Sequence, residues 1–134
     1  MKIIMFALML LSLNSVLAQK SVIMEIPNNC KFIYLNVPSH AKVFTTKTKS
    51  KRLQVHIKAR FGNNVSSELG TYLREKSHRY ELTKEIDSSM SRIFLDHSVI
   101  NPMYVSGNEK IDEKITYYVH VPAGKELVIV PDRT

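Results

Sequence analysis

The chain contains one cysteine, no tryptophan and only four glycines among its 134 residues. One cysteine forms no disulfide within the chain, so the fold has to rest on the packing of apolar side chains. The sequence contains no glycine-rich phosphate loop, no dinucleotide fingerprint and no Gly-x-Ser-x-Gly nucleophile turn. These absences argue against a nucleotide-binding enzyme and a serine hydrolase.

The potential metal ligands are also scattered. The five histidines lie too far apart for His-x-His or His-x-x-x-His spacing, and the cysteine has no partner cysteine. The aspartates fall in turn-like or terminal positions, where carboxylates usually bond to local backbone. We therefore expect no metal, no cofactor and no enzymatic activity.

A long hydrophobic run occurs only at the amino end, in MKIIMFALMLLSLNSVLA. A lysine, an apolar run and a small-residue end are typical of a signal peptide, which predicts residues 1–18 as the leader and cleavage between Ala18 and Gln19. The alternative is a membrane anchor left uncleaved, although the run is shorter than the ~20 residues that span a bilayer. The expected location is periplasmic or secreted, with no stable membrane span after cleavage.

Residues 19–134 then form a single β-rich domain, too short for two cores. The formal charge is +7, and removal of the one charge in the leader, Lys2, lowers it to +6. Part of the excess lies in KTKSKR, which predicts a basic turn made of Lys47, Lys49, Lys51 and Arg52. This turn is either a solvated hairpin tip or a site for an acidic surface or polysaccharide. We expect no nucleic acid partner, because no aromatic side chains are interleaved to stack bases.

Period-2 alternation dominates the domain. In RLQVHIKAR (52–60), Leu53, Val55, Ile57 and Ala59 share one face, and ITYYVHV (115–121) alternates in the same way. Further strands are predicted at 22–26, 32–37, 41–46, 80–86, 92–95 and near 103–105. ELVIV (126–130) is apolar on both faces, which predicts an inner strand.

One segment, 63–77, has helical spacing instead. Val65, Leu69, Tyr72 and Leu73 form an apolar stripe, and Asn63 or Asn64 can cap the start. The fold class predicted is mainly β, either a β-sandwich or the start of a β-helix-like stack, with one short α-helix packed on a sheet.

Two segments share the same pattern of a strand, a proline-containing turn and a second strand. YLNVPSHAKVFTT (34–46) and YVHVPAGKELVIV (118–130) share tyrosine, valine and proline at equal offsets. In each, a strand ends at proline and the chain re-enters a strand after a short turn.

These segments and the leader resemble the adhesin-type domains of exported bacterial proteins, in which a strand ending in Val-Pro-x-Gly introduces further short strands. The resemblance covers about residues 31–130 and implies a structural or binding module of the envelope. The chain ends soon after Val130, where such a series of strands would continue.

Tyr118 and His120 point away from the apolar face of their strand, so they are candidates for a contact surface. We therefore predict a non-enzymatic, exported structural or binding module whose partner is an envelope polysaccharide or another exported protein. The alternative is a small periplasmic inhibitor or chaperone-like protein that offers a sheet edge to a client.

Overall fold

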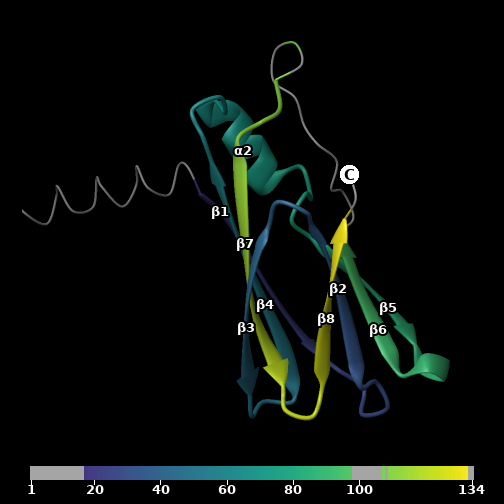
Figure 1. The fold of residues 1–134 in the computed structure, drawn as a ribbon. Helices are drawn as coiled ribbons and strands as arrows, with labels where there is room; N and C mark the ends of the chain where they lie inside the picture. The colour runs from purple at the N-terminus through teal and green to yellow at the C-terminus, as the bar shows by residue number, and fades with distance from the viewer. Residues whose placement is uncertain (1–16, 98–106, 108, 133–134) are drawn as a thin grey trace, which may run out of the picture.

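The computed structural model describes residues 17–97, 107 and 109–132. Two four-stranded sheets face each other across one apolar core (Figure 1). Sheet A has the strand order β1-β4-β7-β3, and sheet B has the order β5-β6-β2-β8. The elements are β1 (Leu17–Glu25), β2 (Phe32–Pro38), β3 (Lys42–Thr48), β4 (Arg52–Phe61), α2 (Ser67–Glu75), β5 (Leu82–Asp87), the 3₁₀ turn η1 (Ser88–Met90), β6 (Arg92–His97), β7 (Glu113–Pro122) and β8 (Glu126–Asp132). The mainly β fold with one short helix is confirmed, and of the two arrangements predicted it is the sandwich that forms.

Alternation along the strands builds the core, as the sequence predicts. Eight inward side chains of β4 and β7 are at most 2% exposed, and sheet B adds four side chains from β2 and β6 that are equally buried. They are Leu53, Val55, Ile57, Ala59, Ile115, Tyr117, Val119 and Val121 in sheet A, and Ile33, Leu35, Ile93 and Leu95 in sheet B. Large apolar side chains of this kind each stabilise the fold by about 1.5–3 kcal/mol when fully buried.

The two strand-proline segments have the same role in space. Pro38 ends β2 and the chain crosses from sheet B to β3 in sheet A, whereas Pro122 ends β7 and the chain crosses back to β8. Strands β2 and β8 pair in parallel, and so do β3 and β7. The second turn needs a glycine, because Gly124 has a φ of 83° in the turn closed by the hydrogen bond from Lys125 N to Pro122 O.

Several strand predictions need correction. The β8 strand is an edge of sheet B and not an inner strand, since among the described residues it pairs only with β2. Its outward side chains Val128 and Val130 lie beside Tyr34 and Asn36 of β2 on the outer face of sheet B. Strand β5 begins at Leu82 rather than at residue 80, and β1 starts before the predicted 22–26, at Leu17. The strand predicted near 103–105 lies outside the described residues.

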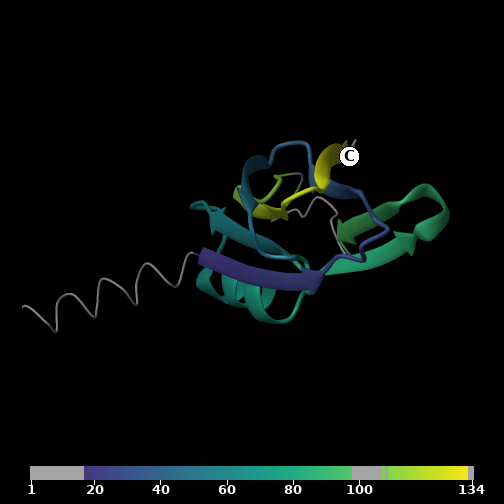
Figure 2. The same ribbon diagram turned by 90° about the horizontal axis from the view of Figure 1, so that it is seen from below.

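Helix α2 is shorter than the predicted 63–77, and it packs against β1 (Figure 2). Its N-cap is Ser66, whose hydroxyl accepts from the Leu69 amide, and neither Asn63 nor Asn64 caps it. Asn64 instead binds the segment before β7, through Lys110 O and the Asp112 amide. Leu73 is buried as predicted, but Tyr72 is 48% exposed. In the described part of the chain, no helix has the length and hydrophobicity to cross a bilayer.

Lys125 fixes the loop between β1 and β2. Its ammonium donates to three backbone carbonyls, those of Pro27 at 3.1 Å, Asn28 at 3.2 Å and Cys30 at 2.6 Å. Hydrogen bonds from a charged donor contribute about 1.5–3 kcal/mol, and their loss leaves partly buried carbonyls without a donor. One side chain from the turn before β8 therefore holds a loop that lies far away in the sequence.

Lys125→Met should lower the free energy of unfolding by about 1–3 kcal/mol, because the three carbonyls lose their common donor. Urea unfolding followed by circular dichroism measures this. Lys51→Met, in the exposed turn before β4, is the matched control and should change the value by less than about 0.5 kcal/mol. Equal stability of the Lys125 variant and the unchanged protein would show that this contact is dispensable.

Candidate functional site

The outer face of sheet A contains a cationic groove of about 560 Å³. We use this name for the hollow lined by His40, Lys42, Lys58, Arg60, Lys114, Ile115, Thr116 and Tyr118. Its lining residues include three lysines, an arginine and a histidine but no carboxylate. A hollow of this kind attracts negatively charged groups.

The strand register assembles the groove from three segments of the chain. Thr116 of β7 pairs with Lys58 of β4 on one side and with Lys42 of β3 on the other. Two residues further along each strand, Arg60 lies opposite Lys114. Because side chains alternate across a strand, all of these lie on the face opposite the buried Ile115 and Tyr117.

The charges of the groove are not neutralised within the described structure. None of its four lysine and arginine side chains is in an ion pair with a described carboxylate. Arg60 and Lys114 are like charges directly opposite each other, an arrangement that destabilises a sheet. Folding thus brings together four cations that no described carboxylate neutralises.

An aromatic pair adjoins the groove, because Tyr118 lines it and Phe44 stacks on Tyr118. The rings of Tyr118 and Phe44 stack with centroids 5.5 Å apart and planes 16° apart. The Lys58 ammonium lies 5.5 Å from the centroid of Tyr118, at cation–π distance. Tyr118 is 38% exposed and Phe44 is 54% exposed. Two exposed rings beside a cluster of cations give a flat apolar surface next to a polar one.

The structure brings Tyr118, predicted as a contact residue, into the groove, and places His120 next to it on the same face. The Nδ1 atom of His120 lies 2.8 Å from the hydroxyl of Thr46 in β3. His56 pairs with Tyr118 in the β4–β7 ladder, and its Nδ1 lies 2.5 Å from the Ser21 hydroxyl. Both histidines thus share the outer face with the groove without lining it.

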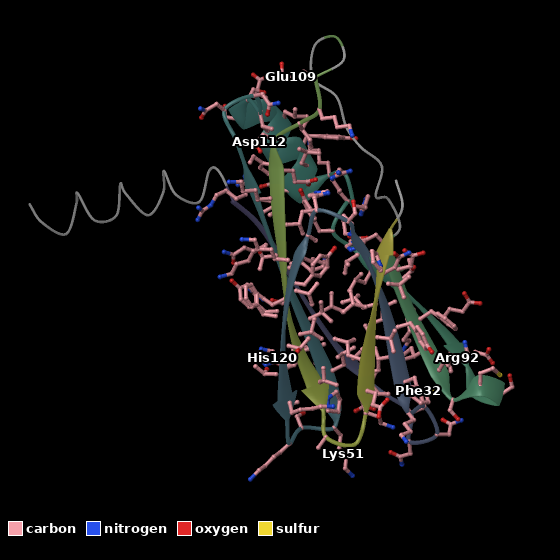
Figure 3. All side chains as sticks on the ribbon, viewed as in Figure 1. Phe32, Lys51, Arg92, Glu109, Asp112 and His120 are labelled. Carbon is pink, nitrogen blue, oxygen red and sulfur yellow. The ribbon has the colours of Figure 1, made fainter. Side chains whose placement is uncertain are left out.

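The basic turn lies elsewhere. Figure 3 shows Lys51 at the lower end of the molecule, below His120. Lys47 donates to the carbonyl of Lys125, and Arg52 forms an ion pair with Glu25 at 3.7 Å. Lys49 and Lys51 are exposed. The turn and the groove are therefore separate basic regions.

The two residues of the predicted cleavage site lie in β1. Ala18 is 1% exposed and pairs with Ala59, and Gln19 is exposed and pairs with Lys58. Cleavage between them would remove Ala18 from the strand and leave the strand to begin at Gln19. The cleavage stays a prediction.

Lys42, Lys114 and His40 were missed as site residues, and so were Lys58 and Arg60, which the alternation of 52–60 had placed on a solvent face. The sequence therefore did indicate that Lys58 and Arg60 face solvent. Their position beside Thr116 and Lys114 depends on the β4–β7 register, which alternation within one strand does not specify.

A second polar cluster is buried and joins the segment after α2 to the start of β7. The Nε and Nη2 atoms of Arg79 donate to the two oxygens of Glu113 at 3.0 and 2.9 Å, and the Tyr80 hydroxyl donates to the same carboxylate. Burial opposes the charge of Arg79, but the bonds and the charge of Glu113 outweigh it and raise the pKa of the guanidinium. Removal of one partner of such a pair typically costs 3–5 kcal/mol, so the cluster has a structural role.

His97 adjoins this cluster from the end of β6. Its Nε2 atom lies 2.5 Å from the hydroxyl of Tyr117. Burial lowers the pKa of His97 to about 4, and the charge of Arg79 acts in the same direction, against the Arg79 backbone and the carboxylates of Asp96 and Glu113. His97 is therefore neutral in the folded protein at neutral pH. Burial also raises the pKa of Tyr117.

The lowered pKa of His97 predicts a loss of stability in weak acid. The unfolded chain takes up the proton near pH 6.5 and the folded chain only near pH 4, so stability is full above about pH 6.5 and falls toward pH 4. Between pH 7 and pH 5 the loss from this group is about 2 kcal/mol. His97→Gln should remove that part of the pH dependence, measured by urea unfolding at both pH values. An equal loss in the variant would mean that other groups cause it.

Among the described residues, no three histidine, cysteine, aspartate or glutamate side chains come close enough to hold a metal ion. Comparison of the chain with protein-family models, with curated proteins and with solved structures gave no match.

Proposed function

We propose that this chain is an exported, non-enzymatic binding domain whose cationic groove holds the anionic groups of an acidic polysaccharide. The observation that carries the proposal is the groove itself: about 560 Å³, lined by four lysine and arginine side chains that are in no ion pair with described residues. Carboxylate, sulfate and phosphate groups share the chemistry that such a surface recognises.

The aromatic pair supports a sugar polymer over a small anion. Pyranose rings have apolar faces that stack on exposed aromatic rings, and Phe44 and Tyr118 offer such rings beside Lys58. A polymer that places a ring on this pair could place its acidic groups among Lys42, Lys58 and Arg60. The resemblance to adhesin-type domains supports a binding role as well, and the amino-terminal segment supports export.

The same lining argues for binding and against cleavage. Hydrolysis of a glycosidic bond generally requires two carboxylates that face each other across the bond. The groove is lined by cations, a threonine, an isoleucine and a tyrosine. It can hold an acidic sugar, but its lining supplies no acid–base pair for such a reaction.

A second candidate, an inhibitor or chaperone-like protein that offers a sheet edge, is favoured by one observation. Strand β8 is an edge strand, apolar over Leu127–Val130, with Val130 39% exposed. The Glu126 amide donates to Lys31 O, so Leu127, Ile129 and Pro131 direct their backbone groups to the open side. Since proline has no amide hydrogen, this edge is short, and the groove is the better supported site.

Loss of the groove cations should weaken binding of acidic oligosaccharides. The double variant Lys58→Gln, Arg60→Gln should bind oligogalacturonate and heparin fragments at least about tenfold more weakly than the unchanged protein, because two charge-assisted contacts are lost. Isothermal titration calorimetry measures this, and comparison of the two ligands distinguishes carboxylate from sulfate recognition. Binding should also weaken as salt increases, since these charges are in contact with solvent and salt screens them.

The matched control is Lys49→Gln, Lys51→Gln, which removes the same net charge from the basic turn. We expect its affinity to fall by less than about threefold, through the long-range field alone. Neutral dextran should not bind. If the control loses as much affinity as the groove variant, or if neither acidic ligand binds, the proposed function is wrong; stoichiometric capture of an extended peptide at β8 would support the second candidate.

A further inference from the structure

The outer face of sheet B has an aromatic centre of its own. Tyr34 of β2 and Phe94 of β6 stack with centroids 5.2 Å apart and planes 27° apart. Val128 of β8 continues the row, because it pairs with Tyr34 in the β2–β8 ladder. Figure 3 shows Phe32 and Arg92, which belong to the next row, on the sheet B side of the molecule, away from His120. We call this surface the sheet B face.

Carboxylates surround this aromatic centre. By the strand register, four carboxylates occupy outward positions, two on β5, one on β6 and one on β8. They are Glu85, Asp87, Asp96 and Glu126. None of them is in an ion pair with a cation among the described residues, although Arg92 lies 5.6 Å above the Tyr34 ring. The Lys31 ammonium likewise lies 5.7 Å from the centroid of Phe32. Four carboxylates and these two cations leave the face with a net negative charge around its aromatic rings.

The sheet B face is also hollowed along β5 and β6. Two shallow depressions, of about 480 and 520 Å³, share Glu85 and Phe94 in their linings. One of them extends to Asp87 and the other to Asp96. Lys84 also lines the second depression, whereas the first has no cation in its lining. A projecting basic side chain would therefore find a ring beside two carboxylates, Glu85 and Asp87, in the first.

The two outer faces of this molecule are therefore complementary. The outer face of sheet A is basic around the Tyr118–Phe44 pair, and the sheet B face is acidic around the Tyr34–Phe94 pair. Opposite charge around a stacked aromatic centre is the arrangement found between bound protein surfaces. We propose that the sheet B face of one copy binds the outer face of sheet A of a second copy, head to tail.

Such an interface is heterologous, so each added copy leaves one free face of each kind. Association continues into a ring or a filament unless one face is blocked. An acidic polysaccharide in the cationic groove would compete for the basic face. The proposal does not depend on that ligand, because it requires the carboxylates of sheet B, which the polysaccharide site does not use.

Two variants test the interface, and each removes two charges from one face. Lys58→Gln, Arg60→Gln removes charge from the sheet A face, and Glu85→Gln, Glu126→Gln removes it from the sheet B face. Sedimentation velocity of the unchanged protein at low salt should show a sedimentation coefficient that rises with concentration and falls back when salt is added. Each variant alone should remain monomeric under those conditions.

The decisive sample is an equimolar mixture of the two variants. One retains an intact sheet B face and the other an intact sheet A face, so together they should form a dimer that does not grow further. Lys49→Gln, Lys51→Gln should associate like the unchanged protein. A monomeric unchanged protein, a mixture that stays monomeric, or a sheet B variant that associates normally would each overturn the proposal. The sheet B variant should still bind oligogalacturonate, so failure here is distinct from failure of the proposed function.

Discussion

The antiparallel pairing of β4 with β7 is the constraint on which both the core and the groove depend. Ile57 pairs with Tyr117 on the inside, and the adjacent pair, His56 with Tyr118, lies on the outside. A slip of one residue in either strand would exchange the two faces of that strand. The buried face would then present lysines and an arginine to the core, so the burial of apolar side chains also determines which cations gather outside.

The two faces of the β4–β7 pair have opposite effects on stability. The inner face of these strands contributes a large part of the burial that stabilises the domain. The outer face places Arg60 opposite Lys114, which opposes folding. The buried charges of Arg79 and Glu113 pair with each other, whereas the groove cations have no described carboxylate as partner. That contrast is the physical reason why we propose binding at the groove and a structural role for the buried cluster.

Local alternation was sufficient to predict the fold class and most strands. The inward positions of 52–60 and 115–121, and the outward direction of Tyr118 and His120, follow from a period of two within one strand. The crossing at Val-Pro was also readable, since proline ends pairing wherever it occurs. Export and the leader remain predictions.

Features that depend on distant contacts were not predictable in this way. The apolar character of 126–130 indicated an inner strand, yet β8 lies at an edge, where its outward Val128 pairs with Tyr34 of β2. The N-cap is Ser66 and not Asn64, whose side chain accepts a hydrogen bond from the Asp112 amide in the segment before β7. Likewise, Lys42, Lys58 and Lys114 come from three strands, and only the order β4-β7-β3 makes them neighbours. A run of cations in the sequence, such as the basic turn, was easier to notice than a cluster formed by folding.

The most direct measurement of the central claim is a map of the bound surface by ¹H–¹⁵N NMR during titration with oligogalacturonate. The account predicts that the backbone amide signals of Lys42, Lys58, Arg60 and Thr116, on three neighbouring strands, shift together and saturate at one ligand concentration. Shifts confined to the basic turn at 47–52, or spread evenly over all exposed lysines, would contradict it.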